Sequence, residues 1–338
     1  MTPLLKHKMS CIVAVVLSIV PPCAGAEKNM PEWKRKRVAL KERYVEGEFR
    51  VFYALEDESA LSPEQRADAD KDGVPDKIQN IARQLVVARR LYVEVFKLRH
   101  PFESPRYKDR VKFFDVCVAS MPKGSNGSAG DGIVNYMRPT DPDGGCEVLT
   151  IDVSKDLWCS NLTPAHELFH EFQNGYTLFK NSWYTEGTAR WSEHAFRKGV
   201  GKAGQLPTTK AEKEALFKLK YDASGFWNAL AEASDREGVF RAPTELEEAR
   251  YVGADQRIIE DLRLHGVDFM RALLEELDTM DDVVSKEEGL DPLDWKEARQ
   301  NAPENNERIW AALLNACRRF EKQSREMQEF VKRFSPAK

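Results

Sequence analysis

The pattern of apolar and polar positions predicts a sheet-forming first half. Residues 48–55 alternate apolar and polar side chains, which is typical of a half-buried strand. Apolar residues recur at three- and four-residue spacing through 77–98, which predicts an amphipathic helix. Strand patterns follow at 111–119, 132–137 and 148–153, separated by clusters of Pro and Gly. We therefore expect a sheet packed beside helices in this half of the chain.

The second half has a different pattern. Helical periodicity dominates residues 210–334 and is strongest at 255–277 and 305–334, whereas no strand pattern of comparable strength occurs there. With 338 residues and 42% hydrophobic content, the chain can form one large or two closely packed domains. The sequence therefore predicts an α+β fold with a sheet-containing part at 47–200 and a mainly helical C-terminal subdomain at 201–338.

The first 26 residues have the composition of a secretory signal peptide. Lys6 and Lys8 precede the apolar run 11–20, and the small residues 24–26 form an A-x-A cleavage site after Ala26. A lipoprotein signal modified at Cys23 is the alternative. We expect a secreted or periplasmic protein in which a charged lead-in, 27–46, precedes the folded part.

Charge and hydropathy exclude several classes of partner. The net charge is −4, and no long basic block occurs, so nothing indicates a nucleic acid or an anionic membrane surface as partner. After the signal peptide no run of eighteen apolar residues occurs, so we expect no membrane span. The sequence carries no signal for the oligomeric state.

Four cysteines remain after the signal peptide, and an even number in an exported chain indicates disulfides. Cys146 and Cys159 bracket a strand-like run, so their pairing is expected first, with Cys117 to Cys317 as the second pair. Buried free thiols are the alternative. Zinc binding by these cysteines is disfavoured because no C-x-x-C spacing occurs.

The strongest chemical signal is an H-E-x-x-H motif formed by His166, Glu167 and His170. Residues four apart project from one face of a helix, so both imidazoles can reach a single zinc ion. Glu186, sixteen residues after the second histidine, is the expected third ligand, and water would take the fourth position. Glu167 flanks the same face and is the expected general base. Two histidines that merely pack or face solvent are the alternative.

A second metal site is expected in the loop 68–76. Carboxylates at Asp68, Asp70, Asp72 and Asp76 recur at short spacing around Gly73, an arrangement that suits Ca²⁺. Gln79 stands where an EF-hand has its glutamate, so the loop is not a standard EF-hand. A solvated acidic turn that caps the next helix is the alternative.

These motifs together resemble a known family. H-E-x-x-H with a glutamate on a following helix is the pattern of gluzincin zinc metallopeptidases. The D-x-D-G-V-P-D loop, H-E-x-x-H-x-x-Q ending at Gln173, and the W-Y-T-E-G-T-A-R-W segment 183–191 are similar to a group of secreted bacterial metalloproteases. The resemblance covers about 48–198. It implies a zincin-like fold, with a twisted mixed sheet packed on the H-E-x-x-H helix and an edge strand that holds extended substrate.

One position departs from the thermolysin-like pattern. Four residues after the third ligand that pattern has an aspartate, where this chain has Arg190. The groups that support the ligands must therefore differ, and another carboxylate could orient a ligand histidine, with Glu193, one helical turn further on the same face, as the candidate.

The resemblance implies a secreted zinc metalloendopeptidase that hydrolyses protein or peptide substrates with metal-activated water. Glu167 would accept the proton of this water. The oxyanion also needs a donor, for which Tyr176, Tyr184 and His194 are candidates, with His194 favoured because imidazole can donate a hydrogen bond.

Two other functions stay open. One is a calcium-dependent binding or adhesion module with a non-catalytic zinc site. It is disfavoured because a closed zinc site needs a fourth protein ligand, and no further His or Cys has suitable spacing. The other is a zinc hydrolase that cleaves a non-peptide amide, such as a cell-wall linkage.

Overall fold

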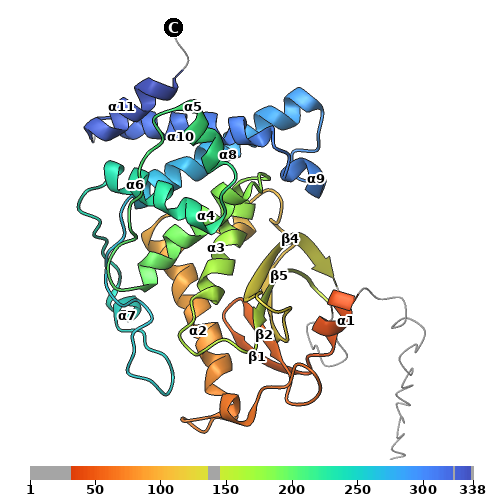
Figure 1. Cartoon of the computed structure of the whole chain (residues 1–338). Helices are drawn as coiled ribbons and strands as arrows, with labels where there is room; N and C mark the ends of the chain where they lie inside the picture. The colour runs from red at the N-terminus through yellow and green to blue at the C-terminus, as the bar shows by residue number, and fades with distance from the viewer. Residues whose placement is uncertain (1–31, 136–144, 323, 336–338) are drawn as a thin grey trace, which may run out of the picture.

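A mixed five-stranded sheet forms one side of the molecule (Figure 1). The computed structural model describes residues 32–135, 145–322 and 324–335, so the predicted signal peptide lies outside the described residues. In strand order β1-β2-β3-β5-β4, the inner pairs β2–β3 and β3–β5 are parallel and the outer pairs are antiparallel. The strands are β1 (Glu42–Glu46), β2 (Phe49–Tyr53), β3 (Phe113–Ala119), β4 (Gly127–Asn135) and β5 (Glu147–Ser154).

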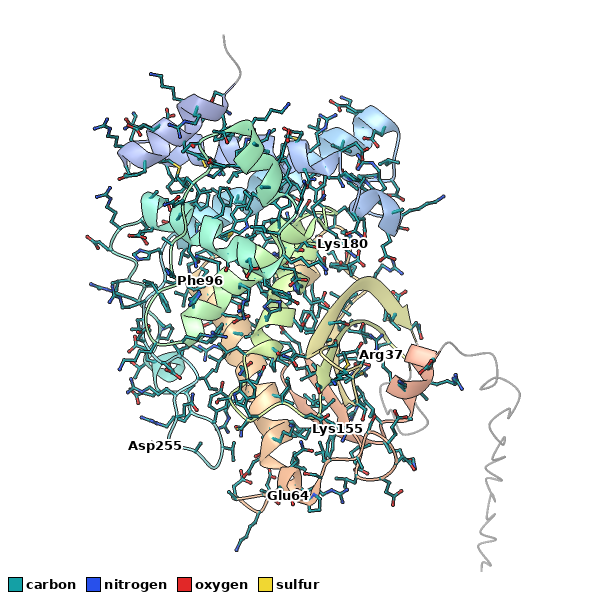
Figure 2. The ribbon with its side chains drawn as sticks, in the orientation of Figure 1. Arg37, Glu64, Phe96, Lys155, Lys180 and Asp255 are labelled. Carbon is teal, nitrogen blue, oxygen red and sulfur yellow. The ribbon has the colours of Figure 1, made fainter. Side chains whose placement is uncertain are left out.

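Alternating side chains on the inner strands point to two different apolar clusters. Phe49 and Val116 belong to the large core on the helix side of the sheet, while Phe52 and Cys117 belong to a small cluster on the other side. Arg37 of α1 (Glu32–Val38) reaches this side of the molecule and forms an ion pair with β5 (Figure 2). Both faces of the sheet are thus covered, which explains why the inner strands are almost wholly buried.

Three helices carry or support the central motif. These are α2 (Asp76–Arg90), α3 (Thr163–Tyr176) and α4 (Ser182–Glu193), and the first two pack on the sheet. The remaining helices gather at the end of the molecule away from the sheet, apart from the short α7 (Figure 1). They are α5 (Lys210–Leu216), α6 (Ser224–Ser234), α7 (Thr244–Glu247), α8 (Val267–Glu288), α9 (Glu297–Gln300), α10 (Asn305–Phe320) and α11 (Arg325–Phe334). The α+β class expected from the sequence is confirmed.

The C-terminal helices share one core with the sheet-containing part. Trp183 of α4 stacks on Trp227 of α6, with ring centroids 5.3 Å apart. Gly187 lies directly under the same indole, since a Cβ built on it would lie 2.5 Å from Trp227 Cδ1. A larger residue at 187 would push α4 away from α6.

Several predicted boundaries differ from the structure. The helix expected at 255–277 begins only at Val267, because Gly266 adopts a left-handed conformation with φ of 72° immediately before it. The pattern at 305–334 forms two helices, α10 and α11, instead of one. The strand expected at 132–137 starts earlier, at Gly127, where small residues hide the alternation of apolar side chains.

Neither predicted disulfide forms. Cys159 and Cys317 are free thiols, so each expected pair lacks one member. The second pair fails because Cys117 is buried in the small cluster, whereas Cys317 is buried in the large core on the other side of the sheet. The first fails because the Cys159 thiol turns to α2, where Asn80 Nδ2 donates a hydrogen bond to it at 3.0 Å.

Helix α8 presents a buried carboxylate to the link between α3 and α4. Asp281 accepts a hydrogen bond from the Leu178 backbone N–H at 2.8 Å. Burial raises the pKa of Asp281 to about 7 from 3.8, although the bond from Leu178 acts to lower it. The folded protein therefore binds more protons than the unfolded chain between these two values, and its free energy of unfolding falls as pH rises through this range.

Replacement of Asp281 by asparagine is expected to remove this pH dependence. The amide oxygen of Asp281→Asn can still accept from Leu178, but no charge is buried at high pH. The variant should be more stable than the wild type at pH 8 by about 4 kcal/mol and nearly equal at pH 4. Urea unfolding at both pH values measures the difference. An equal increase in the free energy of unfolding at pH 4 and at pH 8 would contradict this explanation.

No helix in the described residues has the length and apolar composition needed to cross a membrane.

Candidate metal centre

The H-E-x-x-H segment forms the helix predicted from the sequence. Helix α3 begins at Thr163 with Pro164 in its first turn, where the missing N–H of proline leaves no helical hydrogen bond unmade. Gly175 lies in the last turn of α3, which continues to Tyr176. This glycine allows close approach, since a Cβ there would lie 3.1 Å from Pro101 Cα.

Three predicted ligands meet at one point. His166 Nε2 lies 3.2 Å from His170 Nε2 and 3.3 Å from Glu186 Oε2, and His170 Nε2 lies 3.6 Å from the same oxygen. Donor atoms bound tetrahedrally to zinc at 2.0–2.1 Å lie roughly 3.3 Å from one another. The spacing and the two-nitrogen, one-oxygen donor set of these residues, which we term the metal triad, therefore fit a zinc ion.

The far nitrogens of both rings already have partners. His166 Nδ1 lies 2.9 Å from Glu193 Oε1, and His170 Nδ1 lies 2.6 Å from Gln173 Oε1. Because both partners accept, each ring is held with a proton on Nδ1, so Nε2 can bind a metal once it has lost any proton of its own. Glu193, the carboxylate expected to compensate for Arg190, thus occupies the orienting position.

Gln173 also joins the two helices of the site. Its Nε2 donates to the Thr185 carbonyl at 3.0 Å and to Thr188 Oγ1 at 2.6 Å, while its Oε1 accepts from His170. One side chain of α3 therefore fixes both a ligand ring and the position of α4. This role could be suspected from the H-E-x-x-H-x-x-Q spacing, but its partners could not.

The metal-free triad is strongly coupled electrostatically. Burial lowers the pKa of His166, but hydrogen bonds to Glu186 and Glu193 outweigh it and raise the pKa to about 9. Burial alone would raise the pKa of Glu186. Hydrogen bonds from His166 and His170 outweigh it and hold the pKa of this carboxyl well below its usual range. A divalent cation would replace these shared protons, so the site is arranged for positive charge.

Glu167 lies next to the triad under the edge strand β4. Its side chain is buried, and this burial raises the pKa of its carboxyl. Gly127 passes directly over it, since a Cβ on this glycine would lie 2.8 Å from Glu167 Oε1 and 2.6 Å from Thr163 Cγ2. Glycine is thus required where β4 crosses the proposed base. Among the described strands β4 pairs only with β5, which leaves its outer edge open beside the triad.

Sequence reasoning missed Tyr221, which begins a short 3-10 helix before α6. Its ring lies 6.0 Å from that of His166, and its hydroxyl is close enough to Glu186 and Glu167 for their charges to shift its pKa. Burial, together with the charges of Glu186 and Glu167, raises the pKa of Tyr221 to about 12, so the hydroxyl keeps its proton. No sequence signal marks this residue, because its position depends on how α6 packs against α4.

The three oxyanion donors suggested by the sequence lie elsewhere. Tyr176 OH accepts a hydrogen bond from the Arg99 backbone N–H at 2.6 Å, and Tyr184 is wholly buried in the core. His194 packs against Gly201, where an added Cβ would lie 2.6 Å from the His194 Cδ2. Within the described residues, none of the three forms a hydrogen bond with the triad, whereas the Tyr221 ring lies 6.0 Å from that of His166, so Tyr221 replaces them as the candidate donor.

The acidic loop brings three of its four predicted ligands together. Carboxylate oxygens of Asp68, Asp70 and Asp76 lie within 4.8 Å of one another. Asp72 instead accepts a hydrogen bond from Gln79 Nε2 at 2.7 Å. Gln79 is only 5% exposed, and its Oε1 has no hydrogen-bond partner among the described residues. Rotation of this amide would exchange its oxygen and nitrogen and offer the oxygen to a cation in the loop.

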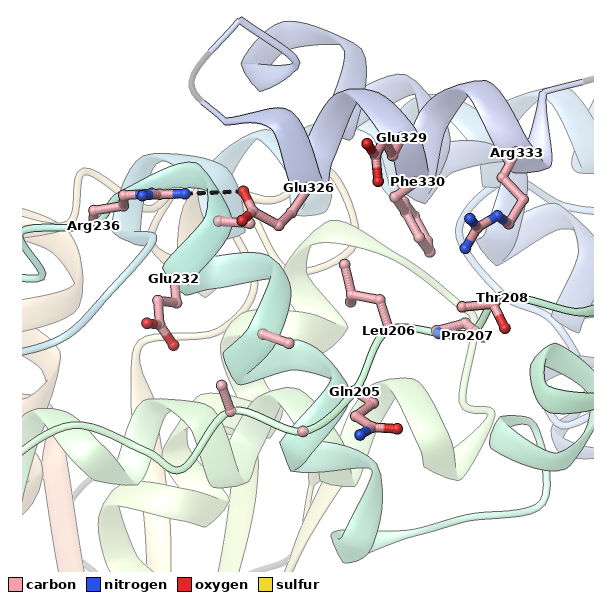
Figure 3. A pocket seen from close by; sticks show the side chains of 14 residues that line it. Gln205, Leu206, Pro207, Thr208, Glu232, Arg236, Glu326, Glu329, Phe330 and Arg333 are labelled. Atoms are coloured by element: carbon pink, nitrogen blue, oxygen red, sulfur yellow. Dashed lines mark hydrogen bonds and ion pairs between the residues drawn. The ribbon is translucent and has the colours of Figure 1, made fainter.

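Two further cavities lie away from the triad. The larger, about 820 Å³, is bounded by α6, α11 and the segment 203–208, with Leu206 and Phe330 facing one another across it (Figure 3). The other, about 800 Å³, contains Asp131, Arg106 and Lys180, the last of which is labelled in Figure 2. Although burial acts to raise it, these two cations lower the pKa of Asp131 to about 2. No residue of α3 or α4 lines either cavity.

Comparison of the chain with protein-family profiles, with curated proteins and with solved structures gives no significant match.

Proposed function

We propose that the protein is an exported zinc-dependent endopeptidase of the gluzincin type, with a zincin-like arrangement of sheet and helices. The observation that carries the proposal is the convergence of two imidazole nitrogens and one carboxylate oxygen at 3.2–3.6 Å, beside a buried glutamate. Among the described residues this group contains three side chains, which leaves a fourth position for water or substrate, as catalytic zinc sites require. The open edge of β4 supports the proposal, because an extended peptide can pair with such an edge.

Each residue of the site has a distinct role in the proposed reaction. A bound zinc ion would lower the pKa of a water molecule and polarise the substrate carbonyl. Glu167 would accept the proton of the attacking water and pass it to the leaving amine, a task for which its raised pKa suits it. The protonated Tyr221 hydroxyl would donate a hydrogen bond to the developing oxyanion. Glu193 and Gln173 would hold the two histidine rings in place.

Digestion of casein and of a peptide library tests this function. Cleavage should disappear when a chelator removes zinc and should return when zinc is added back. A protein that holds one zinc ion per chain but cleaves neither substrate would favour the calcium-dependent binding module with a non-catalytic zinc site. Cleavage of cell-wall amides without cleavage of peptides would favour the second alternative.

We also propose that the loop 68–76 binds Ca²⁺ through Asp68, Asp70 and Asp76, with the Gln79 oxygen as a further ligand. Its role would be structural, because Asp76 begins α2 and its hydrogen bonds to the loop backbone connect the two. Millimolar Ca²⁺ is expected to raise the melting temperature of the zinc-loaded protein by roughly 3–6 °C. Calorimetry measures the shift, and Asp70→Asn should abolish it. An equal shift in that variant would contradict binding in this loop.

A further inference from the structure

A third cavity, of about 490 Å³, is lined partly by residues of α3 and α4 that neighbour the metal triad. Three of its lining residues connect it to the site. Thr163 lies one helical turn before His166, Glu193 holds the Nδ1 of that histidine, and Arg190 contacts the Tyr221 ring at 5.8 Å. A group bound in this cavity would therefore lie next to a substrate at the triad. The size is typical of small-ligand sites.

Two exposed aromatic side chains mark the same region. Trp158, which lines the cavity, is 69% exposed, and Tyr221 is 51% exposed. Large aromatic side chains exposed next to a cavity are characteristic of binding surfaces.

The direction of β4 determines which part of a peptide reaches this cavity. Asn126, which directly precedes β4, lines the cavity, and Gly127 crosses over Glu167. Antiparallel pairing is the more stable arrangement, so a peptide along the open edge would run opposite to β4. Its C-terminal end would then point toward Asn126. The residue directly after the scissile bond would consequently face the cavity.

The two arginines of the cavity approach the same carboxylate at different distances. Glu193 is surrounded by His166, Arg190 and Arg197, with its short contact, 2.6 Å, to Arg197. Arg190 approaches the same carboxylate only at 3.3–3.4 Å and through a single nitrogen. Glu260, the other carboxylate in the lining, accepts from Gln256 at 2.9 Å.

Arg190 is also accessible, because 44% of its side chain is exposed. A guanidinium has five N–H donors in a planar fork that matches a carboxylate. Most of these donors are unused by the hydrogen bonds of the described residues.

We propose that this cavity, which we term the Arg190 pocket, binds an acidic side chain of the substrate residue directly after the scissile bond, and that Arg190 binds its carboxylate. The inference rests on the proposed peptidase function and adds its substrate class. It also gives a role to the position at which the chain departs from the thermolysin-like pattern.

Matched peptides test the Arg190 pocket. A series identical except for Glu, Gln or Lys after the cleaved bond is digested by the full-length, zinc-loaded protein, with cleavage positions verified by mass spectrometry. The kcat/KM for Glu should exceed that for Gln roughly tenfold, as a charge-assisted hydrogen bond predicts, and Lys should be the poorest. Arg190→Gln should bring the Glu to Gln ratio close to one.

The ratio of kcat/KM for the Glu peptide to that for the Gln peptide is compared within each variant. A loss of zinc lowers both values equally, so only a change in recognition alters this ratio. Arg197→Gln is the matched control, since it removes a guanidinium bound to the same Glu193 but should preserve the ratio. Calorimetric binding of the same peptides to zinc-loaded Glu167→Gln should show the same order without turnover.

The outcomes distinguish the two proposals. Chelator-sensitive cleavage with equal rates for Glu and Gln, or a preference that persists in Arg190→Gln, would overturn the Arg190 pocket and leave the peptidase intact. A preference for Lys would instead identify Glu260 as the determinant and also overturn it. A zinc-loaded protein without peptidase activity would overturn both.

Discussion

Replacement of Glu167 by glutamine is expected to reduce peptide hydrolysis by about 10³-fold or more while leaving zinc binding unchanged. The amide fills the same space under Gly127 but cannot accept a proton, and general-base catalysis contributes roughly 10²–10⁴-fold. Because Glu167 is not a member of the metal triad, the three ligands remain. Peptide kinetics and zinc content by atomic absorption measure the two effects.

A matched control lies one helical turn further along α3. Glu171 is wholly buried, and neither carboxyl oxygen has a hydrogen-bond partner among the described residues. Burial raises its pKa well above the ordinary value, which favours the neutral form, so Glu171→Gln is expected to change little. This variant should retain activity. Wild-type turnover by Glu167→Gln, or an equal loss in both variants, would show that the base is assigned wrongly.

Removal of the Tyr221 hydroxyl is expected to have the second largest effect. Tyr221→Phe should lower kcat by roughly 10²-fold with little change in KM, because the proposed hydrogen bond forms mainly in the transition state. Steady-state kinetics on a cleavable peptide give the two parameters separately. A rise in KM at constant kcat would mean that Tyr221 only binds substrate.

Two variants make this test specific. Tyr184→Phe removes another hydroxyl from a tyrosine that is wholly buried in the core, and it should leave kcat unchanged. His194→Asn examines the donor that the sequence favoured, and its effect should be smaller than that of Tyr221→Phe. The reverse order would restore His194 as the donor.

The parts of the site that the sequence predicted are those set by local geometry. His166, Glu167 and His170 lie within five residues, where helical periodicity alone aims them at one face. Glu193 follows from the same reasoning, because it lies one helical turn beyond Arg190 at the end of α4. The strand patterns likewise located most of the sheet, because its inner strands have an uninterrupted apolar face.

The parts that the sequence could not predict depend on contacts between distant segments. Tyr221 reaches the triad only because α6 packs on α4 through Trp183 and Trp227. The disulfide prediction was wrong because spacing along the chain does not show on which side of the sheet a cysteine is buried. Gly127 belongs to no recognisable sequence pattern. The need for glycine at this position becomes visible only when the fold places β4 over Glu167.

The stacking of Trp183 on Trp227 has a consequence for the modularity of this protein. The motifs that resemble those of gluzincins end near residue 198, which invites excision of that segment as an independent unit. Such a fragment would expose the indole of Trp183 and the surface of α4 at Gly187, and it would lack Tyr221. Chimeras that transplant the metal motif into another scaffold would therefore need to carry α6 and the residues that precede it. A cut in this chain should therefore leave α4 and α6 in the same fragment. A cut between the sheet-containing part and the C-terminal helices would separate them.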